Sequence, residues 1–343
     1  MNHPPFPKDN QMTVVHNSYR EERTFVHDTM MYAFHGKIYM AWYSCPQSEI
    51  ADDTMLIGRS SSDNGKTWSA PFVIARDEGK DGEPRHFVPV SFWEYKDTLY
   101  AFVSKMTRHD RPVSVSVYRL LEETTEWEYQ QDLISEADDL SLILNHNALP
   151  QPDGSFLISG RFHPEKNCYP DRPCILRWQG GNMRDWQLIP LSEAPIGNCP
   201  ETSVSRMEKG TLIAVTRNSF GSPALFYVSS DEGKTWRCSE SDLPAIDAKL
   251  YLLTLSTGQT VIAFNKAENE TDRTRLCLAL LNPETLACKK MYTVAHGISE
   301  VGYIYHYPCL LEKDGLLFIS CTVNTPEEIR SAAVFTIPLS NLL

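Results

Sequence analysis

The sequence predicts an all-β fold, a six-bladed β-propeller, and three observations support this prediction. Two eight-residue segments, residues 61–68 and 229–236, share the pattern S-x-D-x-G-x-T-W. Short alternating apolar runs flank a turn at six places along the 343 residues. Helical periodicity is nearly absent, whereas alternation with a period of two is typical of half-buried strands. We therefore expect short antiparallel strands in repeated units rather than helices packed on a sheet.

The eight-residue repeat has the chemistry of a β-hairpin turn. In the first copy, the side chain of Asp63 can accept hydrogen bonds from backbone N–H groups, and Gly65 can adopt a positive φ at no steric cost. Trp68 can pack against the sheet. The second copy supplies the same residue types at Asp231, Gly233 and Trp236. The Gly-Lys-Thr triplets in both copies lack the upstream glycine of a phosphate-binding loop, so we interpret them as turn residues.

The turns divide the chain into six similar units. Their intervals range from 48 to 61 residues, and six units of about 57 residues fill the sequence. The turn residues are Gly36, Asp97, Gly154, Gly210, Gly258 and Gly315. Each unit can hold the four short strands of one blade, so residues 1–343 are expected to form one domain. We expect the strand at residues 12–18 to close the ring against the last blade. A β-sandwich is the alternative, but it does not require a 57-residue period.

Composition and charge exclude several classes of function. The formal net charge of −12 argues against nucleic acid and anionic membrane surfaces as partners, because phosphate groups are bound by clustered Lys and Arg. No run of about 20 apolar residues occurs. The nine cysteines include no metal-binding or paired spacing, which favours reduced thiols and a cytoplasmic protein. No signal peptide is visible, and a secreted or periplasmic location is the alternative if one was removed. No motif indicates a cofactor or a metal.

The repeat also predicts which residues line the central mouth of the propeller. The innermost strands begin eight or nine residues before each turn, and five of these positions hold ionisable side chains where a core would hold Val, Ile or Leu. These residues are His27, His146, Glu201, Lys249 and Tyr307. The second unit has Pro89 at this point, shortly after Arg85 and His86.

The second strands and the loops that follow them contribute further residues to the same face. The positions seven residues after a turn include Arg161, Arg217 and Asn265. The following loops carry Asp52, Asp53, Asp171, Arg172 and Arg273. We predict a basic and aromatic bowl in an otherwise acidic protein, suited to a carboxylate held by Arg side chains. The alternative is that each arginine simply pairs with a neighbouring acid.

These features together resemble the Asp-box, or BNR-repeat, propellers of the sialidase (neuraminidase) superfamily. The resemblance covers nearly the whole chain, and the boxes are specific for the fold. The segment from Glu201 to Arg217 is similar to the family's glutamate, hairpin and arginine segment, with the same internal spacing. Arg273 resembles the last arginine of the family's triad, and Tyr307 resembles its nucleophilic tyrosine.

The resemblance implies a role for each matching residue in a retaining exo-glycosidase. Tyr307 would be the nucleophile and Glu201 its base, because a phenol of pKa about 10 needs a neighbouring group to take its proton. Asp52 or Asp53, shortly before the first box, would be the general acid and base. Arg217 and Arg273, with Arg161, would hold an acidic sugar, either sialic acid or a uronate.

One element departs from the family pattern. Sialidases begin with an arginine segment that supplies the first carboxylate-binding guanidinium, whereas residues 26–29 here read Val-His-Asp-Thr. A charged hydrogen bond contributes about 1.5–3 kcal/mol, so its loss would lower affinity for a carboxylate by about 10- to 100-fold. Arg161 or Arg85 could substitute for it. The departure weakens the prediction for sialic acid itself and leaves a site for an anionic sugar.

Two other functions remain open on the same residues. A polysaccharide lyase or rhamnosidase-type enzyme acting on uronate-containing glycans would use His27, His146 or Tyr307 near the sugar, because histidine titrates near neutrality. A glycan-binding propeller without catalysis would stack a sugar ring on aromatic residues such as Tyr305. Catalysis is favoured because Glu201 and Tyr307 occur together with two matching arginines.

Overall fold

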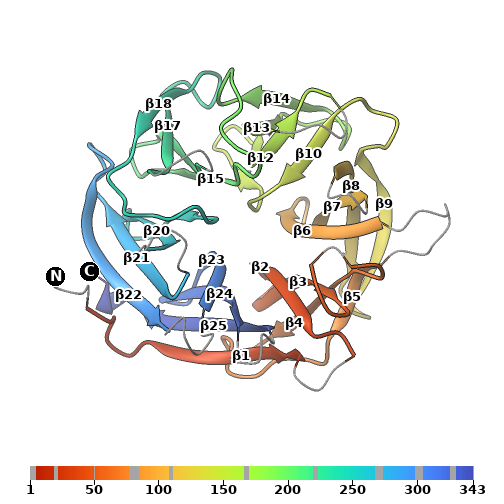
Figure 1. Ribbon diagram of the computed structural model, residues 1–343, viewed down its shortest axis with the longest axis horizontal. Coiled ribbons are helices and arrows are strands. Elements are labelled where there is room, and N and C mark those ends of the chain that lie inside the picture. The colour runs from red at the N-terminus through yellow and green to blue at the C-terminus, as the bar shows by residue number, and fades with distance from the viewer. Residues whose placement is uncertain are drawn as a thin grey trace.

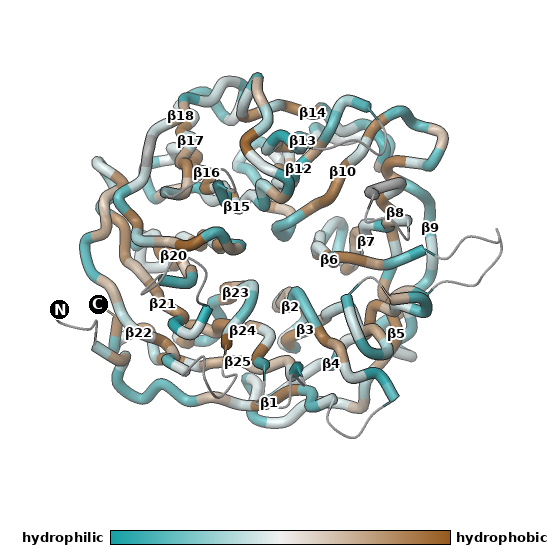
Figure 2. Tube along the Cα trace, viewed as in Figure 1, coloured by the Kyte–Doolittle hydropathy of each residue, from teal (hydrophilic) through white to brown (hydrophobic). Residues whose placement is uncertain are grey.

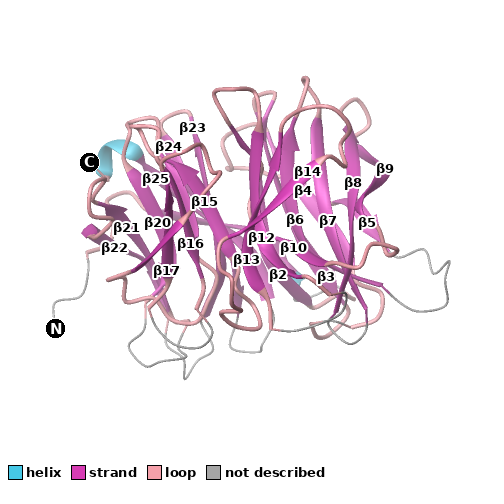
Figure 3. Ribbon diagram, turned by 90° about the horizontal axis from the view of Figure 1, so that it is seen from above, coloured by secondary structure: helices cyan, strands magenta, loops and turns pink. Residues whose placement is uncertain are grey.

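The computed structural model confirms the predicted all-β, six-bladed propeller. It describes residues 5–18, 22–49, 51–76, 85–107, 111–165, 170–218, 223–266, 273–297, 304–324 and 330–342. Within these ranges the strands form six antiparallel sheets arranged around a central axis (Figure 1). The edge-on view shows the sheets standing side by side, with loops on both faces of the disc (Figure 3). No helix in these ranges is long and apolar enough to cross a membrane.

The sheets are named blades 1 to 6, and each is given from its innermost strand outward. Blade 1 contains β2 (Phe25–Phe34), β3 (Lys37–Cys45), β4 (Met55–Ser61) and β5 (Phe72–Arg76). Blade 2 contains β6 (Arg85–Glu94), β7 (Leu99–Thr107), β8 (Arg111–Leu121) and β9 (Glu126–Ile134). Blade 3 contains β10 (Ser141–Leu144) and β11 (Leu149–Pro150), both paired with β12 (Phe156–His163), and then β13 (Arg172–Trp178) and β14 (Trp186–Pro190).

The second half of the ring follows the same order. Blade 4 contains β15 (Thr202–Arg206), β16 (Leu212–Thr216), β17 (Leu225–Ser229) and β18 (Arg237–Glu240). Blade 5 contains β19 (Tyr251–Thr254), β20 (Thr260–Asn265), β21 (Arg275–Leu281) and β22 (Cys288–His296). Blade 6 contains β23 (Ile304–Lys313), β24 (Leu316–Asn324), β25 (Arg330–Pro338) and, outermost, β1 (Gln11–Asn17). A short 3₁₀ helix, η3 (Leu339–Asn341), follows β25.

The outermost strand of blade 6 comes from the other end of the sequence. β1 pairs antiparallel with β25, in a register that runs from Gln11 opposite Thr336 to Asn17 opposite Ser331. The expected ring closure by this segment is therefore present. Closure pairs the outer edge of β25, which would otherwise be open.

The six turn residues that the sequence singled out lie in the hairpins between the first and second strands. All six have positive φ, from 58° at Asp97 to 90° at Gly210. Five are glycine, which adopts this conformation without steric cost. Asp97 shows that an aspartate can take the same place, as short polar residues do in turns.

The two Asp boxes form the hairpins between the third and fourth strands of blades 1 and 4. The Asp63 carboxylate accepts hydrogen bonds from the Thr67 backbone N–H (2.9 Å) and the Thr67 hydroxyl (2.6 Å). The Trp68 indole N–H donates to the Gly65 carbonyl at 3.1 Å. The second box repeats these bonds with Asp231, Thr235, Trp236 and Gly233.

The first box also contacts blade 6 on one face of the disc. The Asn64 amide donates to the Asp314 carboxylate at 3.1 Å, and Lys313 donates to the Asn64 carbonyl oxygen at 2.8 Å. Lys313 and Asp314 lie at the hairpin between β23 and β24. The boxes therefore lie on the hairpin face, opposite the end at which the innermost strands begin.

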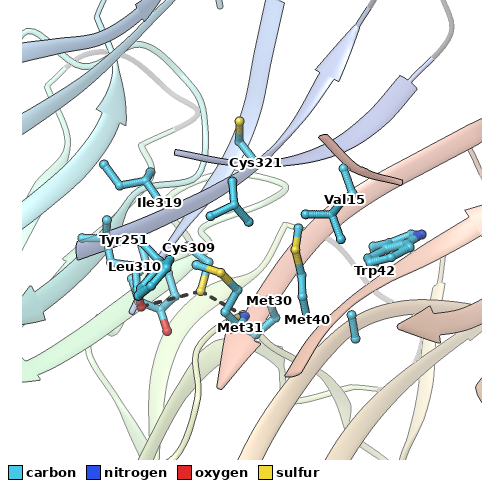
Figure 4. Close-up of a cluster of buried hydrophobic side chains, with 14 of the residues drawn as sticks. Val15, Met30, Met31, Met40, Trp42, Tyr251, Cys309, Leu310, Ile319 and Cys321 are labelled. Atoms are coloured by element: carbon cyan, nitrogen blue, oxygen red, sulfur yellow. Dashed lines mark hydrogen bonds between the residues drawn. The ribbon is translucent and has the colours of Figure 1, made fainter. Parts of the chain in front are cut away.

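The hydrophobic core lies between the blades, and apolar residues concentrate along the strands rather than in the loops (Figure 2). Between blades 1 and 6, Met30, Met31 and Met40 pack with Cys309 and Ile319, all of them fully buried (Figure 4). Shape-adaptable methionine side chains fill this irregular space between two twisted sheets.

Small polar side chains join the innermost strands of neighbouring blades. The Asn147 side chain accepts a hydrogen bond from the Phe92 backbone N–H (2.8 Å) and donates to the Met31 carbonyl (2.7 Å). Asn147 belongs to blade 3, so this one side chain ties blades 1, 2 and 3 together. Such bonds satisfy backbone groups at the inner edge of each sheet, where no further strand can pair. They also fix the positions of the strands that carry the site.

The Asp63 turn gives a prediction about stability and pH. Hydrogen bonds from the Thr67 hydroxyl and backbone N–H lower the pKa of Asp63 to about 2. A carboxyl with a lowered pKa stabilises the folded state fully above its unfolded pKa of about 3.9, and this contribution is lost as the pH falls toward the folded value. Asp63→Asn should therefore lower Tm at pH 7, by a margin that shrinks below pH 4.

Scanning calorimetry of the wild type and Asp63→Asn between pH 7 and pH 2.5 would measure this margin. Glu123→Gln, a change in the exposed turn between β8 and β9, serves as the control and should leave the margin near zero throughout. A constant difference in Tm between the wild type and Asp63→Asn across this range would contradict the prediction.

Candidate active site

The innermost strands of three blades carry the same irregularity where they begin. The strand register shifts between His27 and Met30 in β2, between Val88 and Val90 in β6, and between His306 and Cys309 in β23. Each shift indicates a β-bulge, which re-aims a side chain out of the regular ladder. The residues eight places before the turn lie within these bulges: Asp28, Pro89 and Tyr307. Asp28 and Tyr307 have positive φ, 53° and 51°.

A small cavity of about 80 Å³ opens where these strands begin. Its polar lining residues include Asp28, Tyr43, Glu49, Arg161, Glu201 and Tyr307, and apolar side chains from β6, β7 and β10 complete the wall. A wider groove lies between the outer strands β5 and β9, but its charged lining residues are only Glu126 and Glu128. The cavity at the central mouth is therefore the better candidate for a functional site.

Three predicted residues meet in one hydrogen-bonded group, here called the tyrosine triad: Glu201, Arg217 and Tyr307. The Tyr307 hydroxyl donates to Glu201 Oε1 at 2.9 Å. Arg217 Nη1 lies 3.1 Å from the Tyr307 hydroxyl and 3.0 Å from Glu201 Oε2. The hairpin of β15 and β16 positions two members, because Glu201 immediately precedes one strand, Arg217 immediately follows the other, and their backbones are bonded at 3.0 Å.

The electrostatics of the tyrosine triad keep the proton on the phenol. Burial by itself would raise the pKa of Glu201, but the guanidinium groups of Arg217 and Arg161 and the hydrogen bond from Tyr307 hold it below its usual value. Burial, followed by the charge of Glu201, raises the pKa of Tyr307 well above 10, against the opposing effect of Arg217 and Arg273. An ionised carboxylate thus accepts a hydrogen bond from a neutral phenol, the arrangement that general-base activation requires.

Two further predicted residues surround the Tyr307 ring. The Arg273 guanidinium lies 5.3 Å from the ring centroid and contacts His306 Nδ1 at 2.9 Å. The His27 ring lies 4.5 Å from the Tyr307 ring, measured between centroids. Burial, together with the nearby positive charges and His306, lowers the pKa of His27 well below its usual value. His27 is therefore neutral and supports the tyrosine ring.

Two buried ion pairs complete the site. Lys249 Nζ donates to Asp28 Oδ1 at 2.5 Å, and the exposed fractions of the two side chains are 1% and 5%. Burial raises the pKa of Asp28, and Lys249 opposes that effect. Arg161 donates to the Asp171 carboxylate and to the Asn198 carbonyl, the latter at 2.9 Å. Arg217 also donates to the Asp247 carboxylate.

The cavity is consequently more acidic than the predicted basic bowl. Among the described residues, its ionisable carboxyl groups are Asp28, Glu49 and Glu201, and its one lining guanidinium is Arg161. The physical reason is that Arg161 and Arg217 are already paired with carboxylates, which was the alternative considered for them. Arg273 differs, because its contacts here are with His306, the Asp247 carbonyl and the Tyr307 ring.

Three predicted residues on the rim do not line the cavity. Asp52 and Asp53 lie on the loop after β3, where both are exposed, and Asp53 pairs with Arg23 at 2.6 Å. Arg85 makes a two-pronged contact with Glu136, at 2.9 Å for each bond. The loop that carries Asp52 and Asp53 instead contributes Glu49 to the cavity.

Three other predicted residues lie below or behind the cavity and have structural contacts. The ring nitrogens of His146 lie 2.8 Å from the Asn147 carbonyl and 3.3 Å from the Leu252 carbonyl, and burial lowers the pKa of His146 to about 4. The Asn265 amide donates to the Tyr305 carbonyl at 2.9 Å. Tyr305 itself packs into the core between the blades.

Sequence reasoning missed Asp28 and Glu49, both of which line the cavity. The repeat could have identified Asp28, because Asp28 lies eight residues before the turn residue Gly36, just as Tyr307 lies eight residues before Gly315. Counting nine residues selected His27 instead. Nothing in the sequence distinguishes Glu49 from Asp52 and Asp53 in the same loop. In the described part of the chain, no group of three or more His, Cys, Asp and Glu side chains could hold a metal ion.

Fold and site together define a six-bladed propeller with a carboxylate-bound tyrosine at its central mouth. The family model for the BNR repeat-like domain matches residues 36–319, so the chain belongs to this family. The resemblance to sialidase-superfamily propellers is thereby confirmed for the fold. A search of the curated proteins found no match.

Several solved structures share the fold. A protein of unknown function from Dyadobacter fermentans is 15% identical, with a TM-score of 0.72 and coverage of 95% of this chain and 98% of its own. Trypanosoma rangeli sialidase in complex with sialic acid is 15% identical, with a TM-score of 0.74 and coverage of 99% and 60%. That sialidase was also solved with 2,3-difluorosialic acid as a covalent intermediate. Hadza microbial sialidase Hz136 is 13% identical, with a TM-score of 0.75 and coverage of 96% and 69%. The chain thus spans 60% to 69% of the length of these sialidases.

The buried pair of Lys249 and Asp28 yields a prediction about stability. Removing one partner of a buried ion pair leaves an uncompensated charge and costs about 3–5 kcal/mol. We expect Lys249→Met to lower the free energy of unfolding by about this amount, and the double variant Lys249→Met/Asp28→Asn to recover much of the loss.

Urea denaturation would measure these changes. Lys209→Met removes a lysine with an exposed fraction of 76% and should change the free energy of unfolding by less than about 0.5 kcal/mol. The prediction is wrong if Lys249→Met behaves like Lys209→Met.

Proposed function

We propose that this protein is a retaining glycoside hydrolase in which Tyr307 is the nucleophile and Glu201 its base. The observation that supports this most strongly is the hydrogen bond of 2.9 Å from the Tyr307 hydroxyl to Glu201 at the wall of the cavity, with Arg217 3.1 Å from the same hydroxyl. A tyrosine nucleophile is a known alternative to the usual pair of carboxylates in glycosidases. The covalent intermediate solved for the Trypanosoma rangeli sialidase supports a covalent route for this fold.

The first step forms a bond between Tyr307 Oη and the anomeric carbon of the sugar while the glycosidic C–O bond breaks. The phenolic proton moves to Glu201, and the leaving oxygen takes a proton from a general acid. In the second step water attacks the anomeric carbon and the Tyr307–sugar bond breaks. Glu201 then returns its proton to the tyrosine oxygen, and the general acid recovers its proton from the attacking water.

Arg217 and Arg161 favour this sequence by keeping Glu201 ionised in the resting enzyme. Their guanidinium groups lower the pKa of Glu201 against the effect of burial. Because Tyr307 starts as a neutral phenol, no buried tyrosinate has to be maintained. The negative charge on Tyr307 develops only as its proton moves to Glu201, and Arg217 and Arg273 lie beside it at that moment.

Glu49 is our candidate for the general acid and base. It lies at the edge of the cavity, in the loop that also carries Asp52 and Asp53, and it accepts a hydrogen bond from the Tyr43 hydroxyl at 2.6 Å. Asp52 and Asp53 were predicted for this role, but neither lines the cavity, and Asp53 is paired with Arg23. The position of Glu49 therefore fits proton transfer to a leaving group better.

The proposed substrate is a glycan with an acidic sugar. The Trypanosoma rangeli sialidase was solved with sialic acid bound, which supports a carboxylated sugar as the class of ligand. The group that we assign to the anion is Arg273, which lies outside the lining of the cavity but contacts the ring of the lining residue Tyr307 and a neutral histidine, His306. Arg161 and Arg217 are less suited to binding a substrate anion, because each is already paired with a carboxylate of the protein.

The lyase alternative is less well supported. Of the three residues considered as its base, His27 and His146 are buried outside the lining of the cavity. The third, Tyr307, lines the cavity but retains its proton, because its pKa is raised well above the usual value. Both ring nitrogens of His146 contact backbone carbonyls.

Loss of the nucleophile provides the main test. Against a panel of 4-methylumbelliferyl glycosides, including the N-acetylneuraminide and hexuronides, Tyr307→Phe and Glu201→Gln should each lower kcat by at least about 100-fold, because nucleophile activation by a general base contributes about 10²–10⁴. Tyr129→Phe, on the exposed outer strand β9, should retain the wild-type rate. Mass spectrometry of enzyme treated with a fluorinated substrate analogue should find the sugar on Tyr307. Full activity in Tyr307→Phe, or no turnover of any glycan by the wild type, would overturn the proposal.

The role of Glu49 predicts a dependence on the leaving group. A good leaving group needs no proton, so Glu49→Gln should slow release of an alkyl or sugar aglycone at least tenfold more than release of 4-methylumbelliferone in the glycosylation step. Single-turnover kinetics on matched substrates would separate that step from deglycosylation. Equal effects on both leaving groups would exclude Glu49 as the proton donor.

A further inference from the structure

The carboxyl group of Asp28 is built into the cavity, and Asp28 lies in the segment of residues 26–29 that corresponds, by sequence pattern, to the first arginine segment of sialidases. Asp28 lies in the bulge of β2 with φ of 53°, a conformation that costs energy for a residue other than glycine. The exposed fraction of the residue is 3%, yet it lines the cavity. A strained, buried, charged residue at the wall of a cavity needs an explanation beyond folding.

Lys249 fixes this carboxyl group and leaves part of it available. The ammonium group bonds to Asp28 Oδ1 at 2.5 Å and lies 5.7 Å from the centroid of the Tyr307 ring, so it holds Asp28 close to the nucleophile. Among the described residues, the hydrogen bond from Lys249 is the one made to this carboxylate. Because Asp28 lines the cavity, we take its second oxygen, Oδ2, as the acceptor that a ligand would reach.

An ionised carboxylate in this position can only accept hydrogen bonds. A sugar hydroxyl is a suitable donor, whereas a substrate carboxylate would meet like charge from Asp28 and from Glu201 and Glu49 in the same wall. Lys249 is not one of the residues that line the cavity, so a ligand there meets the carboxylate of this ion pair and not its ammonium group.

We propose that Asp28, held by Lys249, is a specificity-determining residue that binds a sugar hydroxyl beside Tyr307 and excludes a carboxylate attached to the reacting carbon. This inference rests on the proposed glycosidase function and narrows its substrate class. Among acidic sugars, this leaves a hexuronide, whose anomeric carbon carries hydrogen, and excludes sialic acid. A carboxylate elsewhere on the ring can still approach Arg273.

Equilibrium binding tests this assignment without relying on turnover. Calorimetric titration would compare methyl glucuronide, methyl galacturonide, methyl glucoside and methyl galactoside with the methyl α-glycoside of N-acetylneuraminic acid. We expect the best hexoside or hexuronide to bind the wild type at least tenfold more tightly than the sialoside. Asp28→Ala should weaken binding of that ligand by about 10- to 100-fold, the value of a charged hydrogen bond.

Two further variants separate recognition from folding. The double variant Asp28→Asn/Lys249→Met carries no unpaired buried charge, so it should fold. In this variant, the ratio of the affinity for the best hexoside or hexuronide to the affinity for the sialoside should be at least fivefold smaller than in the wild type. Asp314→Asn, on the hairpin face, is the matched control and should bind like the wild type. Tighter binding of the sialoside by the wild type, no binding of any of these glycosides at millimolar concentration, or unchanged preference in both Asp28 variants would overturn the inference.

The same proteins distinguish this inference from the proposed function. If the Asp28 variants bind like the wild type while Tyr307→Phe loses turnover, the hydrolase stands and the role of Asp28 is wrong. If the preference depends on Asp28 but the wild type turns over no glycan, sugar recognition stands and the hydrolase is wrong.

Discussion

The antiparallel pairing of β1 with β25 is the constraint on which the rest of the structure depends. The outermost strand of blade 6 comes from the opposite end of the sequence and is followed along the chain by β2 of blade 1, so this pairing fastens the last blade to the first. Closure holds β23 beside β2, so that Tyr307 and Asp28 face the same cavity. Asn147 adds a similar constraint on the other side by joining blades 1, 2 and 3.

Within that ring, the site is organised as a set of compensated charges. Glu201 is paired with Arg217, Asp28 with Lys249, and Asp171 with Arg161. Compensation makes it possible to bury so many charged groups, since an isolated ion would shift its pKa or unfold the site. It also fixes where the proton of Tyr307 resides, because an ionised Glu201 accepts the hydrogen bond of the neutral phenol.

The fold was predictable from the sequence because its signals are local and repeated. Turn residues recur at similar intervals, and each Asp box contains the residues that form the hydrogen bonds of its own hairpin. The tyrosine triad was partly predictable for the same reason, since one hairpin connects Glu201 and Arg217. Tyr307, ninety residues from Arg217, reaches them only through the closed ring.

The other site residues could not be predicted from the repeat, because their positions depend on a strand bulge and on the paths of loops. In a regular strand, neighbouring side chains point to opposite faces, so an error of one residue exchanges them. The bulge in β2 adds a residue at this point, and the repeat alone could not decide between His27 and Asp28. The path of the loop after β3 decides that Glu49, rather than Asp52 or Asp53, reaches the cavity. The partners of Arg85 and Arg161, which are Glu136 and Asp171, lie in loops, so the repeat could not decide which arginines are paired.

The recurrence of the bulge has a consequence for how such proteins diversify. The same backbone irregularity presents aspartate in blade 1, proline in blade 2 and tyrosine in blade 6 to one shared cavity. A substitution at any of these positions would change the chemical group offered to a ligand at that point of the wall. Relatives that share the propeller fold can therefore differ in the groups at these bulges and, with them, in the ligand that they bind.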